Sequence, residues 1–199
     1  MSEAWRTIKH IAEQGNGQIT PGLAAASGVS RTTLSAMTDK GMLVRVSRGV
    51  YTLADTITDE YALLQSHCGK AVFSLGTALY FWGLSDRVPH QIDVTVPQGT
   101  NISRVRAAAG KLRCHYVKSE LHPLGITTTI SPMGSEIRLY DKERCICDLI
   151  RSRDTTDKQL YTQAIKDYFA GKPNTRKLIK YSKALGVEDQ VRAYMEVLL

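Results

Sequence analysis

Asp93 lies in a short apolar run that predicts a β-strand, and its position in that run suggests metal chemistry. The run reads Ile92-Asp93-Val94-Thr95-Val96 and follows, after a predicted helix, the glycine turn Leu75-Gly76-Thr77. Catalysis with paired divalent metals needs two carboxylates on the same face of such a strand, hence two residues apart. The second position holds Thr95, so this strand alone cannot form the metal pair.

A glycine turn followed by an acidic strand is similar to the pattern of nucleotidyltransferases. Thr95 makes an active transferase of that kind improbable, and a catalytically silent relative of the fold remains an alternative. The five histidines show no paired ligand spacing, no Ser or Cys lies in a nucleophile elbow, and the four cysteines form no C-x-x-C pair. We therefore expect no catalytic residues, no metal and no cofactor, and the chain is not expected to be an enzyme.

A polar cluster begins the predicted helix at 141–152. Asp141, Glu143 and Asp148 lie close to Arg144 in sequence, and Arg151, Arg153 and Asp154 continue the cluster. Acidic residues at the start of a helix complement its dipole. We interpret the cluster as structural ion pairs.

The first 54 residues read as three short helices followed by a β-hairpin. Apolar residues from Trp5 to Ala12 recur at helical spacing, Thr20-Pro21 opens a second helix that stops at Gly28, and Ser30 caps a third. The strands follow at 43–46 and 50–53, joined by the turn Ser47-Arg48-Gly49. This order predicts a winged helix-turn-helix, a DNA-binding module.

If the third helix enters the major groove, its N-terminal and outward residues meet the DNA. Those residues are Ser30, Arg31, Thr32, Thr33, Ser35 and Ala36. Arg31 suits a bidentate contact to guanine or a pairing with phosphate, and the threonines suit phosphate or methyl contacts. In the wing, Arg45 and the tip residue Arg48 suit a minor-groove or phosphate contact. The alternative is that these arginines are solvated surface charges.

The net charge of +7 is concentrated at the two ends of the chain. Residues 1–54 hold 6 basic against 3 acidic side chains, 55–150 hold 10 against 10, and 151–199 hold 10 against 6. Near the C-terminus, Arg176, Lys180 and Lys183 share one face of a predicted helix. This basic stripe is interpreted as extra DNA contact, a site for an acidic protein, or a solvated outer face.

The chain is predicted to be an α+β protein of two domains. Residues 1–54 form the winged helix-turn-helix, and residues 55–199 form a mixed α/β domain with a helical C-terminal end, because helices and strands alternate there without a repeat. No apolar run approaches the length of a membrane span, and the N-terminus has no secretory signal. We therefore expect a cytoplasmic protein with no membrane partner.

Five segments in order resemble the antitoxins of AbiE-type abortive-infection systems, a type IV toxin–antitoxin group of viral defence. They are LVRVSRGVYTL (43–53), ALYFWGLSDRVP (78–89), IDVTVPQGTN (92–101), YDKERCICDLIRSR (140–153) and DQVRAYMEVL (189–198). Cys145 departs from the threonine expected there. The resemblance implies a winged helix that binds inverted repeats of double-stranded DNA in its own promoter and represses the operon. It also implies a C-terminal domain that neutralises a nucleotidyltransferase-like toxin without a stable complex.

The oligomeric state and two other functions stay open at this point. One winged helix reads a short half-site, so inverted repeats require two copies, either a preformed dimer or monomers that pair on DNA. One alternative function is a nucleotidyltransferase-related enzyme whose N-terminal helices contact protein. The other is a winged-helix regulator of a different operon with a C-terminal sensor domain.

Overall fold

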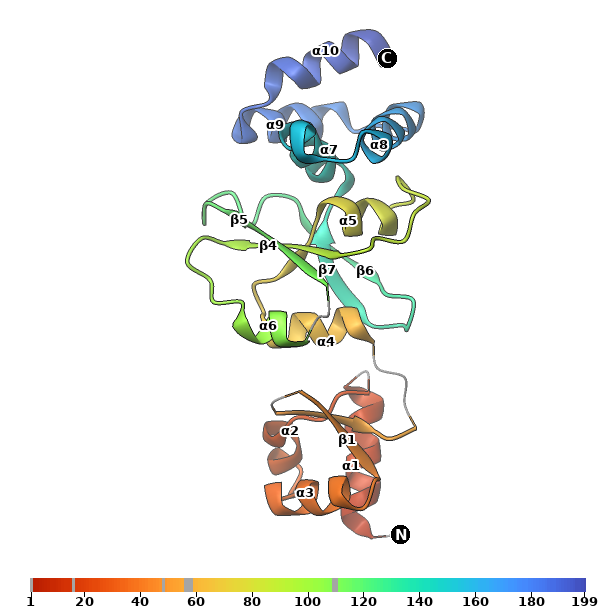
Figure 1. The fold of residues 1–199 in the computed structure, drawn as a ribbon, viewed down its shortest axis with the longest axis vertical. Coiled ribbons are helices and arrows are strands. Elements are labelled where there is room, and N and C mark those ends of the chain that lie inside the picture. Colours follow the sequence, from red (N-terminus) through yellow and green to blue (C-terminus); the bar gives the residue numbers. More distant parts are fainter. Residues whose placement is uncertain (1, 16, 48, 56–58, 109–110) are drawn as a thin grey trace. The chain divides into compact units, whose positions relative to one another are not determined.

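The computed structural model describes residues 2–15, 17–47, 49–55, 59–108 and 111–199 (Figure 1). The chain folds into two compact units, one of Met1–His67 with Ile130–Ile137 and one of Cys68–Thr129 with Arg138–Leu199. The division predicted from the sequence, at residue 54, stays a prediction. In the described residues, no helix is long and apolar enough to cross a membrane.

The first unit begins with three helices and a hairpin, at the places that the sequence predicts. The elements are α1 (Glu3–Gln14), α2 (Pro21–Ala26), α3 (Arg31–Asp39), β1 (Leu43–Ser47), β2 (Val50–Leu53) and α4 (Glu60–His67). Apolar side chains from the first three helices meet in one core, among them Ile8, Ala24 and Leu34, each at most 1% exposed. Burial of these side chains stabilises the unit, because it removes apolar surface from water.

Both ends of α2 have the geometry predicted from their residues. At its start, Thr20 caps the helix by accepting a hydrogen bond from the Leu23 amide. In the turn that leads to α3, Gly28 has a φ of +81°. The Val29 amide then donates to the Ala24 carbonyl at 2.8 Å, and the Val29 side chain is buried. A residue with a Cβ is strained at such a φ, so glycine is the residue that this turn requires.

The end of α3 leads directly into the hairpin. The Gly41 amide donates to Thr38 and the Met42 amide donates to Met37, the pair of bonds that defines a Schellman motif. Strands β1 and β2 are antiparallel, with Leu43 opposite Leu53 and a bulge after Arg45. α3 and the hairpin are thus joined without a flexible spacer.

A mixed five-stranded sheet has most of its residues in the second unit. Its strand order is β5-β4-β3-β7-β6, where β3 is antiparallel to β4 and parallel to β7, and β4 is parallel to β5. The strands are β3 (Val72–Phe73), β4 (Ile92–Pro97), β5 (Leu112–Val117), β6 (Ile126–Ile130) and β7 (Glu136–Tyr140). Side chains such as Phe73, Val94 and Leu139 are fully buried.

Helices cover this sheet on both sides. α5 (Leu75–Phe81) and α7 (Lys142–Arg151) lie on one side, and α6 (Ser103–Ala108) lies on the other (Figure 1). After the 3-10 turn η1 (Arg153–Thr155), the chain ends in α8 (Lys158–Ala170), α9 (Thr175–Leu185) and α10 (Glu188–Leu198). These C-terminal helices pack on α7 and on one another. The molecule is α+β, as predicted.

Candidate functional site: a nucleic-acid interface and a charged cluster

The N-terminal end of α3 is organised by hydroxyl groups. Ser30 caps the helix by accepting a hydrogen bond from the Thr33 amide at 3.1 Å. Its hydroxyl also lies 2.6 Å from the Thr32 hydroxyl and 2.9 Å from that of Thr33. Ser30 and Thr33 therefore hold the helix end in shape, while Thr32 and Arg31 are exposed.

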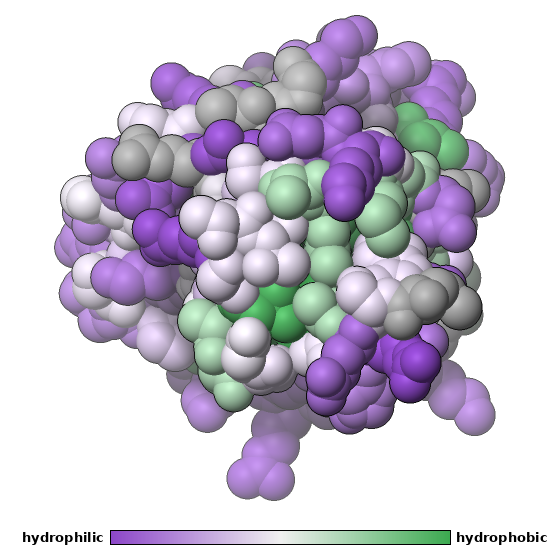
Figure 2. Space-filling model, turned by 90° about the horizontal axis from the view of Figure 1, so that it is seen from below, coloured by the Kyte–Doolittle hydropathy of each residue, from purple (hydrophilic) through white to green (hydrophobic). Residues whose placement is uncertain are grey.

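The outward face of α3 carries small side chains between Arg31 at its start and the exposed Asp39 at its end. Ser35 and Ala36 are exposed, whereas Leu34 and Met37 are buried, as the sequence predicts. Figure 2, which views the molecule from the side where α3 lies in Figure 1, shows pale and green atoms among purple ones. Small side chains let a helix approach the edges of base pairs closely.

The hairpin places one of its two predicted arginines in a described position. Arg45 is exposed, and its guanidinium lies 6.0 Å from the centre of the Tyr51 ring, at the outer limit of a cation–π contact. Tyr51 is in turn fixed to Ile19 by a pair of backbone hydrogen bonds, at 2.8 and 2.9 Å. Arg48 lies outside the described residues, so its contact stays a prediction.

The basic stripe predicted near the C-terminus lies on α9, in the second unit. Arg176, Lys180 and Lys183 are exposed, and Lys183 lies 3.8 Å from Glu188. The neighbouring Lys177 has a different role, because its ammonium lies 2.8 Å from a carboxylate oxygen of Asp141. That hydrogen bond raises the pKa of Lys177.

Asp93 is a deeply buried acid of the second unit, at 1% exposure. The Arg113 guanidinium binds both of its oxygens, with Nε 2.6 Å from Oδ1 and Nη2 3.1 Å from Oδ2. His115 Nε2 lies 2.9 Å from Oδ1. Burial alone raises the pKa of Asp93, but the hydrogen bonds from His115 and Arg113 outweigh it and hold that pKa below its usual value.

Arg113 and His115 were not predicted from the sequence to act on Asp93. Parallel pairing places Asp93 opposite Arg113 and Thr95 opposite His115, so one face of β5 meets the acid on β4. The Arg-x-His alternation on the predicted strand is a signal that these two side chains share a face, and it was not used to predict a contact with Asp93. Thr95 donates to the Ser74 hydroxyl at 2.9 Å, a structural bond in the position where a second carboxylate was sought.

Arg144 and Asp148 of the polar cluster form a structural ion pair on α7, as predicted. Arg144 is 1% exposed, its Nε lies 2.8 Å from Asp148 Oδ2, and its Nη1 donates to the carbonyls of Leu121 and Leu124. Asp141 caps α7 by accepting from the Arg144 amide at 2.9 Å. These bonds attach the 118–125 loop to α7, so the role of the cluster is to hold the backbone of that loop in place.

The Cys145 side chain is fully buried in the same helix. Its thiol lies 3.4 Å from the Tyr140 carbonyl, and burial raises its pKa well above the usual value. A thiol of this kind packs as a small apolar group. The departure from threonine at this position therefore leaves the helix intact.

Comparison with known proteins locates the relationship at the N-terminus. Residues 6–54 match the family model described as "Transcriptional regulator, AbiEi antitoxin". A search of curated proteins finds no match. Among solved structures, the RV2827C protein from Mycobacterium tuberculosis is similar, with a TM-score of 0.63, 13% identity, and coverage of 97% of this chain and 80% of that one. At that identity the likeness concerns the fold alone. The part of the chain that is similar to the family described as "Transcriptional regulator, AbiEi antitoxin" is thus residues 6–54, which contain α2, α3 and the hairpin.

Proposed function

We propose that the chain is a DNA-binding autorepressor whose N-terminal unit is a winged helix-turn-helix. In this proposal α3 is the reading helix and the β1–β2 hairpin is the wing. The observation that carries it is the outer face of α3, where the exposed Arg31 and Thr32 are held by the Ser30 cap on a helix anchored in the core. The match of residues 6–54 to a family of transcriptional regulators supports the proposal.

Each side chain then has a distinct task on the DNA. Arg31 has a charged fork that suits guanine or phosphate, and the exposed Ser35 and Ala36 suit close contact with base edges. Arg45, which lies beside the Tyr51 ring, suits a phosphate at the edge of the groove. Arg48 is proposed to make a minor-groove or phosphate contact. Two copies meet an inverted repeat, one on each half-site.

A reporter driven by the upstream DNA of the chain's own gene tests this proposal. Wild-type protein is expected to repress the reporter, and the double variant Arg31→Ala/Arg48→Ala is expected to relieve repression at equal protein level. Arg104→Ala removes an exposed arginine of α6 that has no assigned DNA contact, and serves as the matched control. Equal repression by the wild type and the double variant contradicts the proposal.

We further propose that the chain is the antitoxin to a nucleotidyltransferase-like toxin and acts without a stable complex with it. The support is the AbiEi antitoxin description of the matched family. Co-expression with the product of the adjacent gene tests it, and growth is expected to recover. The Arg31→Ala/Arg48→Ala variant separates the two functions, because recovery should persist when repression is lost. Growth arrest that wild-type protein leaves unchanged contradicts the antitoxin role.

We also infer that the chain is a binding protein and not a transferase. Both oxygens of Asp93 are engaged by Arg113 and His115, and a threonine stands two residues further along β4. A carboxylate held in this way serves as a fixed counterion. Nucleotide transfer by the purified protein, with Mg²⁺ or Mn²⁺ supplied and loss of turnover in Asp93→Ala, would overturn this inference.

A further inference from the structure

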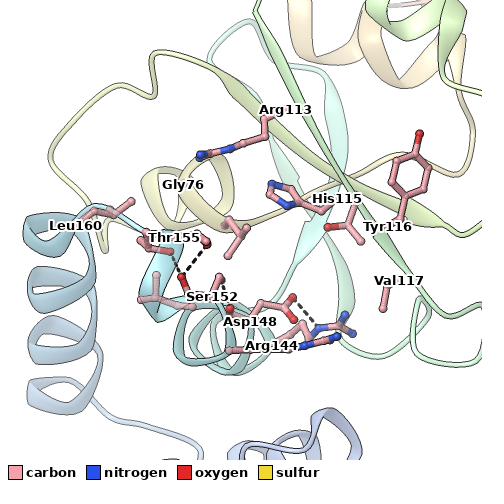
Figure 3. Close-up of a pocket in the computed structure, with 15 residues that line it drawn as sticks. Gly76, Arg113, His115, Tyr116, Val117, Arg144, Asp148, Ser152, Thr155 and Leu160 are labelled. Atoms are coloured by element: carbon pink, nitrogen blue, oxygen red, sulfur yellow. Dashed lines mark hydrogen bonds and ion pairs between the residues drawn. The ribbon is translucent and has the colours of Figure 1, made fainter.

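A pocket of about 310 Å³ lies in the second unit, lined by residues of α5, β5, α7 and η1 (Figure 3). That volume is at the lower end of the range of small-molecule sites, ~300–1,000 Å³. It suits a ligand of mononucleotide size better than a polymer. The chemistry of the lining differs from one wall to the other, and this difference indicates what the ligand must carry.

The wall formed by β5 carries two basic side chains beside a buried acid. The Arg113 and His115 side chains are 51% and 31% exposed, although both also bind the buried Asp93. Figure 3 shows the two side chains extending from the same strand toward the cavity. Arg113 balances the charge of Asp93, and Arg151 adds a further exposed cation to the lining. An anionic group is the natural complement of this wall.

The opposite wall accepts hydrogen bonds. Ser152 donates its hydroxyl proton to the Asp148 carbonyl, and Thr155 and Thr156 donate theirs to the Ser152 carbonyl at 3.1 and 2.8 Å. Because each hydroxyl proton is already donated to a backbone carbonyl, the three hydroxyl oxygens are left to act as hydrogen-bond acceptors toward the pocket. A ligand group that donates, such as a sugar hydroxyl or an exocyclic amine, is the complement of this wall.

The rest of the lining combines leucine side chains, one of them strained, with the Arg144–Asp148 ion pair, whose two charges offset each other. Leu75 and Leu160 supply aliphatic surface on which a flat ring can lie, whereas Leu149 of the same lining is fully buried. Leu75 has a φ of +41°, the single positive value for a non-glycine residue among those that the structure describes. Residues held in such conformations cluster at ligand sites, where the surroundings fix them.

We propose that this pocket binds a nucleoside monophosphate. The phosphate contacts Arg113, His115 and Arg151, the sugar or base donors contact the hydroxyl wall, and the base lies on the leucines. Such a ligand combines an anion, hydrogen-bond donors and a flat apolar ring, the three complements that the walls require. The residues of the site all belong to the second unit and include none of those proposed to contact DNA.

Calorimetric titration of the full chain with AMP, GMP, CMP and UMP tests the proposal, with adenosine and inorganic phosphate as separate probes. At least one nucleotide is expected to bind at one site per chain, and AMP is expected to bind at least about tenfold more tightly than adenosine, the contribution of one charged hydrogen bond. Arg151→Gln is the main variant because this side chain is exposed and the nearby, largely buried acid Asp148 keeps Arg144 as its partner. It should weaken nucleotide binding about tenfold.

Arg104→Gln removes an exposed arginine outside the pocket lining and should leave the affinity unchanged. Circular dichroism of each variant confirms that the fold is retained. Absence of saturable binding for all four nucleotides at millimolar concentration overturns the proposal. So does equal affinity for AMP and adenosine, equal affinity for phosphate and the best nucleotide, or equal weakening by Arg151→Gln and Arg104→Gln.

Discussion

Arg113 binds both carboxylate oxygens of Asp93, and the two residues stand opposite each other on the parallel strands β4 and β5. The acid is buried and the guanidinium is half exposed. A buried carboxylate without a partner lowers the stability of a fold, so the Arg113–Asp93 pair largely sets the energetic cost of burying an acid on β4.

Arg113→Ala should destabilise the chain because it leaves Asp93 buried with only His115 as a partner. The expected loss is about 1–3 kcal/mol in the free energy of unfolding, a value reduced for the exposure of Arg113 to solvent. Urea unfolding measures it. In the double variant Arg113→Ala/Asp93→Asn the loss should be smaller, and an equal or larger loss contradicts this account.

The Asp93 carboxylate should also make stability depend on pH. Its pKa in the folded chain is lowered, so its contribution is complete above the unfolded-state pKa of about 3.9 and is lost as the pH falls through the lower folded-state value. The difference in unfolding free energy between wild type and Asp93→Asn is therefore largest between about pH 5 and 7 and shrinks below about pH 4. Urea unfolding at pH 7, 5 and 3 measures this difference, and a constant value would show that the carboxylate is not stabilised by its partners.

Gly125→Ala should be among the most damaging small substitutions in the second unit. A Cβ there lies 2.7 Å from Arg144 Cβ and 3.1 Å from Asp141 Oδ1, and the φ is +83°. We expect a loss of about 2–4 kcal/mol, from overpacking and strain together. Gly134→Ala is the matched control, since its φ is +87° but nothing lies within 4 Å of its Cβ. Thermal unfolding compares the two, and equal losses contradict the packing argument.

Ser30 offers a way to separate helix capping from DNA contact. Ser30→Ala removes the cap of α3 and should cost about 1 kcal/mol of stability. Ser30→Asp keeps a good cap and should restore stability, but its negative charge should weaken DNA binding. Urea unfolding and fluorescence anisotropy with labelled DNA report the two effects. If DNA affinity falls in Ser30→Ala and returns in Ser30→Asp together with stability, Ser30 affects DNA binding only by stabilising the fold.

The sequence predicted the N-terminal unit well because its signals are local. Thr20, Gly28 and Ser30 mark helix ends through their own backbone and side-chain chemistry, and the structure places each in that role. The α7 cluster was predicted for the same reason, since Arg144 and Asp148 are one helical turn apart.

The charged cluster on β4 and β5 could not be predicted in this way. Asp93 and Arg113 are 20 residues apart, and only the parallel register of their strands brings them together. The pocket beside them depends further on α7 and η1, which follow much later in the chain. Sequence spacing carries no information on such pairings until the strand order is known.

The central claim is that α3 reads DNA, and the affinity of the purified full chain for its own upstream DNA tests it most directly. Anisotropy titrations at several salt concentrations should give an affinity that falls with salt and exceeds that for a scrambled sequence by at least ~10³-fold. Arg31→Ala should weaken binding to the upstream DNA by about 1–3 kcal/mol, or roughly 5- to 150-fold, while Arg104→Ala should not. Equal affinity for both sequences, or binding that Arg31→Ala leaves unchanged, would contradict the account.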